Sequence, residues 1–133
     1  MATLGITVDL ACGQQEAIER TTKALSEEGF GVISRIDIDE KFKDKLGVDF
    51  RPYTILGACN PALAHKALTA EPGVGLLLPC NVCVEEQAGG SRVHIVDAEN
   101  MMSSAGIDDN ETISELGRDA SERLERVAQA LRE

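Results

Sequence analysis

Aromatic side chains are scarce in this chain, with three phenylalanines, one tyrosine and no tryptophan among 133 residues. Proteins that bind single-stranded nucleic acid stack bases on aromatic side chains, so that class of function lacks its usual platform here. Apolar residues still make up 43% of the chain, and we therefore expect a packed core built from aliphatic side chains. The length is that of one domain, spanning residues 1–133.

Positive charge is also in short supply, because 13 lysines and arginines face 23 acidic residues and the formal net charge is −10. Such a surface repels phosphate backbones and anionic lipid, so we expect neither nucleic acid nor a membrane as a partner. No stretch approaches the roughly 20 apolar residues that cross a bilayer. Met1–Ile6 has no basic segment before an apolar block, unlike a secretory signal. These features predict a cytoplasmic protein whose four cysteines are thiols.

Motifs of common enzyme classes are missing as well. The chain contains no Ser-His-Asp spacing, no phosphate-binding loop and no H-E-x-x-H sequence. Gly73 and Gly75 precede a predicted strand rather than a helix, so they do not form a phosphate cradle. The sequence therefore favours a protein without a cofactor and without enzymatic activity.

Hydrophobic periodicity predicts five strands and three long helices. The strands are expected at Leu4–Leu10, Phe30–Ile38, Asp49–Cys59, Val74–Glu86 and Arg92–Asp97, and the helices at Gln14–Glu28, Asn60–Glu71 and Glu111–Arg132. A helical turn over Asp39–Gly47, a hairpin turn at 87–90, a linker over Met101–Asn110 and a capping box of Thr112 with Glu115 complete the assignment.

The order β-α-β-β-α-β-β-α predicts an α+β fold, a two-layer sandwich. Its mainly antiparallel sheet should have helices packed on one face. Pro52 places the third strand at an edge or marks its first residue. A second apolar face of the sheet would need another subunit to cover it, so we expect a homodimer.

The Cys80-Asn81-Val82-Cys83 segment has the spacing of a redox or zinc motif. In a strand, residues three apart are about 10 Å apart and point to opposite faces, whereas a disulfide needs Cα atoms within about 7 Å. A zinc site would need a second pair of ligands. Cys12, Cys59, His65 and His94 could supply them only if the fold brought them together, so no metal site is predicted.

Cys59 directly precedes Asn60-Pro61, where Asn is a typical helix N-cap and Pro a typical first helical residue. The positive end of a helix dipole stabilises a thiolate, which makes Cys59 a candidate reactive thiol. If the strands that hold Cys59 and Cys80 are neighbours, the two sulfurs could form a redox pair. The alternative, which the sequence favours, is that both are small buried hydrophobic residues. His65 is expected to face solvent, and Asn81, polar in an apolar strand, is a candidate to bind a ligand.

The central stretch resembles the family known as domain of unknown function 302. The matching segments are Gly29–Val32, Ile36–Ile38, Tyr53–Pro61 (Y-T-I-L-G-A-C-N-P) and Gly75–Val82 (G-L-L-L-P-C-N-V). The resemblance covers about residues 3–102, and the helix 111–132 matches the family's general layout. It implies a small two-layer α+β domain that forms homodimers and has no established activity. The family's recurrent residues map to Cys59, Asn60, Pro61, Pro79, Cys80 and Asn81, whereas Cys12 and Cys83 lie outside that set.

The resulting hypothesis is a binding or structural module with a pocket near Cys59 and Cys80. Cys59, Asn60, Pro61, Cys80 and Asn81 are its candidate ligand-binding residues. The first alternative is a thiol-redox or sulfur-handling protein that uses Cys59 with Cys80, and the second is a metal-binding protein.

Overall fold

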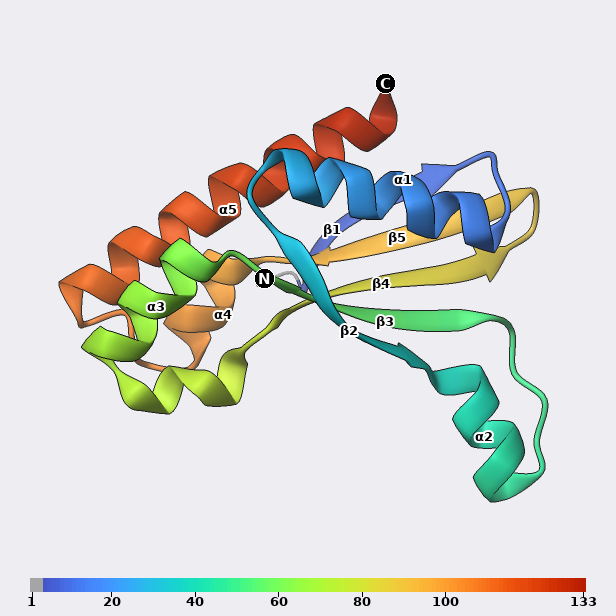
Figure 1. Cartoon of the computed structure of the whole chain (residues 1–133), viewed down its shortest axis with the longest axis horizontal. Helices are drawn as coiled ribbons and strands as arrows, with labels where there is room; N and C mark the ends of the chain where they lie inside the picture. The colour runs from blue at the N-terminus through green and yellow to red at the C-terminus, as the bar shows by residue number, and fades with distance from the viewer. Residues whose placement is uncertain (1–3) are drawn as a thin grey trace.

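One antiparallel sheet forms the centre of the structure (Figure 1). Its strands are β1 (Gly5–Leu10), β2 (Gly31–Asp37), β3 (Tyr53–Cys59), β4 (Cys80–Gln87) and β5 (Gly90–Val96), in the spatial order β1-β5-β4-β3-β2. The structure is a computed structural model that describes residues 4–133. The first three residues of the predicted non-secretory N-terminus lie outside the described residues.

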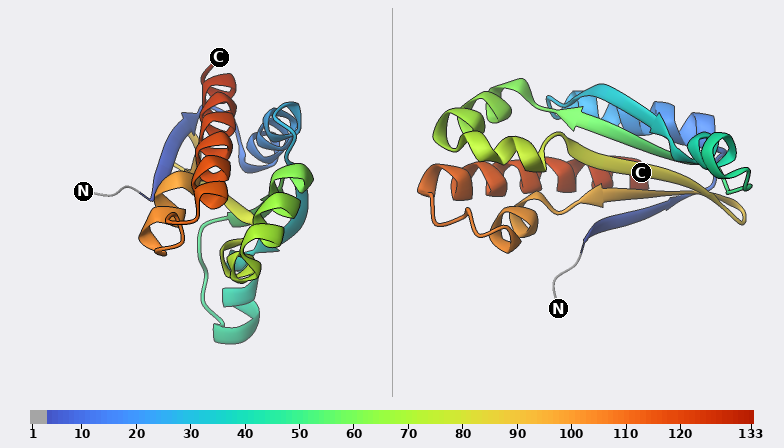
Figure 2. Two further views of the ribbon diagram at one scale, coloured as in Figure 1. Left: turned by 90° about the vertical axis from the view of Figure 1, so that its left-hand side faces the viewer. Right: turned by 90° about the horizontal axis from the view of Figure 1, so that it is seen from below.

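Two long helices, α1 (Gln14–Glu27) and α5 (Glu111–Arg132), lie together on one face of this sheet (Figure 2). Shorter helices, α3 (Pro61–Ala70) and α4 (Ala98–Ser104), pack against α5 at one end of the sheet. This arrangement confirms the predicted α+β fold with helices on one face. None of the helices in residues 4–133 is long and apolar enough to cross a membrane.

The main core lies between the sheet and the two long helices. It is aliphatic as predicted, with Phe30 as its one aromatic member. Alternate strand residues point into it, because successive side chains of a strand lie on opposite faces. The fully buried members include Val82, Val84, Val93 and Ile95 from the sheet and Leu25, Leu124 and Val127 from the helices. A second, smaller cluster joins Ala67, Val74, Met102 and Ile113 at the end of the sheet.

The predicted strand Val74–Glu86 is wrong over its first part. Residues Pro72–Leu77 form a short 3₁₀ helix, η1, and β4 begins only at Cys80. The side chain of Glu71 caps this helix by accepting a hydrogen bond from the Gly73 N–H at 3.3 Å. Val74 is fully buried while Leu76 is 91% exposed. A short apolar run does not by itself distinguish a strand from a helical turn.

The predicted linker over Met101–Asn110 is also partly wrong, because its start belongs to α4. The carboxylate of Asp97 caps that helix by accepting from the Asn100 N–H at 2.9 Å. Helix α5 is capped by Asn110, which accepts from the N–H groups of Thr112 and Ile113, and not by the predicted capping box. An Asn residue fills the cap position as well as Ser or Thr does.

Strand β3 begins at Tyr53, directly after Pro52, and lies between β4 and β2 in the interior of the sheet. The first reading of Pro52 as an edge marker is therefore wrong, and the second, as a strand start, is correct. The expected helical turn over Asp39–Gly47 is present as α2 (Ile38–Leu46). None of the side chains of α2 is buried. It ends at Gly47, whose positive φ of 67° suits a residue without a side chain.

Candidate functional site

An apolar cavity of about 260 Å³ lies at the end of the sheet where β3 ends and β4 begins. The sheet end, α3, α4 and α5 form its wall. The lining residues are Phe30, Ile33, Ala58, Cys59, Asn60, Leu63, Ala64, Ala67, Leu68, Leu78, Pro79, Cys80, Ala98, Met102, Ile113, Leu116, Gly117 and Ala120. Two of them, Ile33 and Leu68, are 65% and 42% exposed, so the cavity opens to solvent beside them.

Small residues keep this cavity open. Ala64 and Ala67 face it from α3, and Gly117 and Ala120 face it from α5. Alanine and glycine leave the space between two helices that larger side chains would fill. The resulting wall carries carbon and sulfur atoms almost throughout, and Asn60 is the one lining residue with an amide or charged side chain.

Asn60 holds the helix that forms one side of the cavity. Its Oδ1 accepts from the Leu63 N–H at 3.2 Å, and its Nδ2 donates to the Glu28 carbonyl at 3.4 Å. The same carbonyl accepts from Arg123 Nη1 at 3.2 Å, which links α3 to the end of α1 and to α5. The predicted cap and the first helical position of Pro61 are both confirmed. Asn60 therefore positions the cavity wall, and Pro61 is not part of that wall.

Cys59 and Cys80 both line the cavity, since Ala58 pairs with Cys80 across β3 and β4. The structure thus brings the two predicted thiols to one site. Cys80 is buried, and this burial, with a smaller contribution from nearby Cys59, raises the pKa of the Cys80 thiol to about 11. Cys80 is therefore a protonated thiol at neutral pH. No His, Asp or Glu side chain lines the cavity among the residues that define it, so neither sulfur has a general base there.

The remaining predicted site residues lie elsewhere. Asn81 and Cys83 point to the opposite face of the sheet from Cys80, as the alternation of a strand requires. The side chain of His65 is exposed on α3, as expected. All four cysteines are free thiols. Within residues 4–133, no three His, Cys, Asp or Glu side chains are grouped to hold a metal ion.

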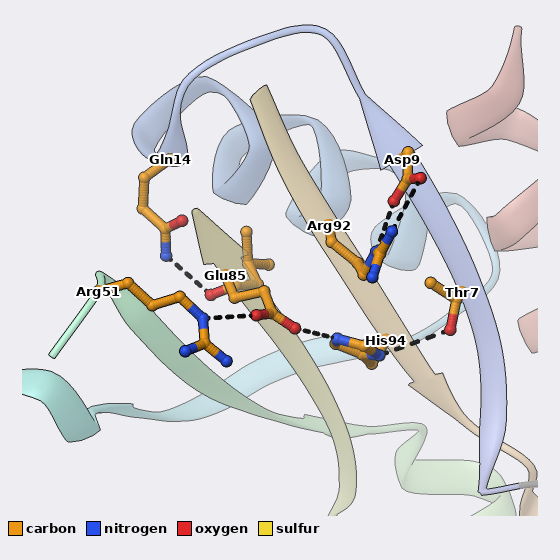
Figure 3. A network of polar contacts seen from close by, with 8 residues as sticks. Thr7, Asp9, Gln14, Arg51, Glu85, Arg92 and His94 are labelled. Atoms are coloured by element: carbon orange, nitrogen blue, oxygen red, sulfur yellow. Dashed lines mark hydrogen bonds and ion pairs between the residues drawn. The ribbon is translucent and has the colours of Figure 1, made fainter. Parts of the chain in front are cut away.

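The uncovered face of the sheet carries a polar network that the sequence reasoning missed (Figure 3). Arg51 Nε donates to Glu85 Oε1 at 2.8 Å, and His94 Nε2 bonds the other oxygen of that carboxylate. Thr7 Oγ1 lies 3.5 Å from His94 Nδ1 on the neighbouring strand. The hydrogen bond from His94 is the largest influence and the one from Arg51 adds to it, so the pKa of Glu85 is lowered below 4.5.

Two further pairs extend this face. Arg92 holds Asp9 through two nitrogens, with Nε at 2.7 Å and Nη2 at 3.3 Å. Tyr53 lies next to Cys83, and burial together with the neighbouring Cys83 and Glu85 raises the pKa of its hydroxyl to about 12. In the sequence, the alternation of Arg92 and His94 with buried residues was the available signal for this network. It could not identify the partners, because these come from three other segments of the chain.

A two-layer α+β domain with a bare sheet face and an apolar cavity at the sheet end is the class of protein that these observations define. The chain belongs to the family described as "Domain of unknown function DUF302", whose sequence model matches residues 6–131. The predicted resemblance is thus confirmed, and the match continues through α5, beyond residue 102. The crystal structure of an uncharacterized conserved DUF302 protein from Bacillus stearothermophilus is 32% identical, with a TM-score of 0.86. That alignment covers 98% of this chain and 100% of the other. Comparison with curated proteins gave no match.

Proposed function

We propose that this protein is a binding module that holds an apolar small molecule in the cavity beside Cys59 and Cys80. The cavity itself carries this proposal. An engineered apolar cavity of about 150 Å³ stays dry and binds benzene, and this one, at about 260 Å³, is larger. Its contents would therefore be an uncharged ring system or a short aliphatic chain, because a charged group would find no partner on these walls.

The shape of the site supports a ligand rather than a packing defect. The cavity joins the smaller core cluster around Val74, Met102 and Ile113 to the main core. A ligand would restore the van der Waals contacts that the small residues of α3 and α5 leave unmade. Its entrance beside Ile33 and Leu68 gives such a ligand a route from solvent.

Replacing Ala64 by phenylalanine should close the cavity, because this residue lines it from α3. The neutral fluorophore 1-aminoanthracene serves as the probe, and its emission rises when it leaves water. We expect saturable binding to the unmodified protein and at least a tenfold loss of affinity in Ala64→Phe, which corresponds to about 1.4 kcal/mol. Fluorescence titration measures both values.

Ala62→Phe is the matched control, since Ala62 is an exposed residue of the same helix and does not line the cavity. Its affinity for the probe should equal that of the unmodified protein. The proposal fails if the probe does not bind the unmodified protein, or if both substitutions leave its affinity unchanged.

A thiol-redox or sulfur-handling role of Cys59 and Cys80 is the second candidate. Their place on one cavity wall favours it, whereas the raised pKa of Cys80 opposes it. We also propose a cytoplasmic location for the protein. Its four free thiols are consistent with a reducing compartment.

We also propose that the protein is a homodimer, and the β2 edge of the sheet is the surface that supports this best. β2 has β3 as its one neighbour in the sheet, and Ile33 and Ile36 on it are 65% and 44% exposed. An exposed edge strand pairs readily with a copy of itself around a two-fold axis. The uncovered face of the sheet, by contrast, carries ion pairs and hydrogen bonds of Glu85, His94 and Arg92. It is therefore not the apolar face that the sequence predicts as a dimer interface.

Sedimentation velocity should therefore show a dimer that Ile33→Lys converts to a monomer, because a charge at a paired edge blocks association. Leu46→Lys is the control, since Leu46 is 69% exposed on α2 and lies outside strand β2. A monomeric unmodified protein would contradict the dimer, and a dimer that persists in Ile33→Lys would exclude this edge.

A further inference from the structure

A second hollow, of about 780 Å³, lies on the uncovered face of the sheet and is separate from the cavity. We propose that it binds a small organic carboxylate, whose carboxyl group is held by Arg51 and whose apolar body lies along β5 toward Val96. Arg51, Tyr53 and Glu85 line one end of this hollow, His94 lies at its middle, and Leu4 and Val96 line the other end.

Arg51 is held in place before any ligand arrives (Figure 3). Its Nε donates to Glu85, and its guanidinium carbon lies 4.6 Å from the centre of the Phe50 ring. Within residues 4–133, Nη1 and Nη2 of Arg51 make no hydrogen bond or ion pair. Arg92, in contrast, uses both Nε and Nη2 on Asp9. The two terminal nitrogens of a guanidinium match a carboxylate in two parallel hydrogen bonds.

The hydrogen-bonding capacity left in this hollow is mainly that of donors. Arg51 occupies Oε1 of Glu85 and His94 occupies Oε2. Glu85 is only 14% exposed and its pKa is lowered, so it stays an ionised acceptor for those two side chains. The amide of Asn81 lines the hollow as a further donor. A ligand that brings a negatively charged hydrogen-bond acceptor would therefore pair with these free donors.

Charge supports the same conclusion. The chain as a whole carries −10, yet the one carboxylate among the residues that line this hollow is paired with the guanidinium of Arg51. The hollow is thus a part of an acidic surface where repulsion of an anion is locally offset.

The far end of the hollow indicates the chemistry of the part of the ligand beyond its carboxylate. Glu85 pairs with Arg92, and Val96 lies four residues further along β5, about 13 Å away at the usual rise of a strand. Leu4 at this end is 97% exposed and Val96 is partly buried. A straight aliphatic chain attached to the carboxylate would run along β5 toward these two side chains and remove apolar surface from water.

Sodium octanoate is the probe for this site, titrated at pH 7 into the ¹⁵N-labelled full chain and followed by amide chemical shifts. We expect saturable shifts at Arg51, Glu85 and His94. Arg51→Gln should weaken this binding by at least tenfold. Arg51→Lys should retain part of the affinity, because it keeps the charge and loses the paired donors. Octan-1-ol, which lacks the carboxylate, should not shift these amides.

Arg35→Gln is the control, since Arg35 is also a half-exposed arginine paired with a carboxylate, Asp37, but lies on β2 outside the hollow. It should leave octanoate binding unchanged. Three results would overturn the proposal: no saturable shift up to about 10 mM, equal affinity in Arg51→Gln, or shifts confined to α3 and α5. The last result would assign octanoate to the cavity instead, and Ala64→Phe would then abolish it.

Discussion

Leu124→Ala should lower the free energy of unfolding by about 3 kcal/mol and the melting temperature by about 10 °C. Leu124 is completely buried on α5, in the main core. Its truncation removes apolar contacts and leaves a void that the neighbouring side chains cannot fill, because strands and helices enclose it on all sides. Urea unfolding followed by far-ultraviolet circular dichroism measures the change.

Leu116→Ala is the matched comparison, two turns earlier on the same helix. Leu116 is partly exposed and lines the apolar cavity, so its truncation enlarges an existing space rather than creating one. We expect a loss of about 1 kcal/mol, mostly the transfer free energy of a half-buried side chain. Equal losses for the two variants would show that the space beside Leu116 is filled by protein, and would also contradict the proposed ligand site.

Cys80 should react with iodoacetamide about 100-fold more slowly at pH 8 than a free cysteine. The thiolate is the reactive form, and the pKa of about 11 leaves far less of it than the ordinary value of 9.0 does. Because the pKa of this thiol is raised to about 11, its rate should rise about tenfold with each pH unit up to that value, whereas the rate of a free cysteine levels off near its own lower pKa. Mass spectrometry of the modified peptides gives the rate for each cysteine separately.

Labelling in urea provides the control, since unfolding removes the burial and should bring all four cysteines to similar rates. If Cys80 instead reacts in the folded protein as fast as in urea, its thiol is activated. A reversible disulfide with Cys59 would then become the working mechanism, in place of a passive cavity wall. Slow labelling of both sulfurs in the folded protein would identify them as packing residues.

The parts of the fold that are encoded locally could be predicted from the sequence. Asn60 and Pro61 specify a helix start through their own side chains, and the structure shows the expected cap. The long amphipathic pattern of α5 likewise defines its buried face over six turns. In such segments the periodicity repeats often enough to identify one structure.

The segments that were predicted wrongly are those in which local pattern leaves two structures open. Val74–Leu77 is apolar throughout, and the burial of Val74 with Met102 and Ile113, together with the Glu71 cap, favours a helical turn there. Residues 101–104, the last part of α4, fit a predicted linker as well, because four residues are too few to show a helical period. In both segments tertiary packing acts together with a side-chain cap.

The composition of the two candidate sites depends on strand register, which the sequence alone does not show. Cys80 and Asn81 are adjacent in sequence, yet one lines the cavity and the other lies on the opposite face. The pairing of Cys83 with His94 places polar side chains from β4 and β5 side by side, and only the register of the hairpin shows this. A shift by one residue would exchange the two faces completely.

Helix α2 projects from the rest of the domain (Figure 1), and we expect it to open locally without unfolding of the core. It has no buried residue and packs mainly against β3. Its amide protons should therefore exchange with solvent through local opening, at a free energy well below that of global unfolding. The same independence allows residues between β2 and β3 to be inserted or removed without disturbing the core. Among relatives of this protein, this connection is where differences in chain length should accumulate.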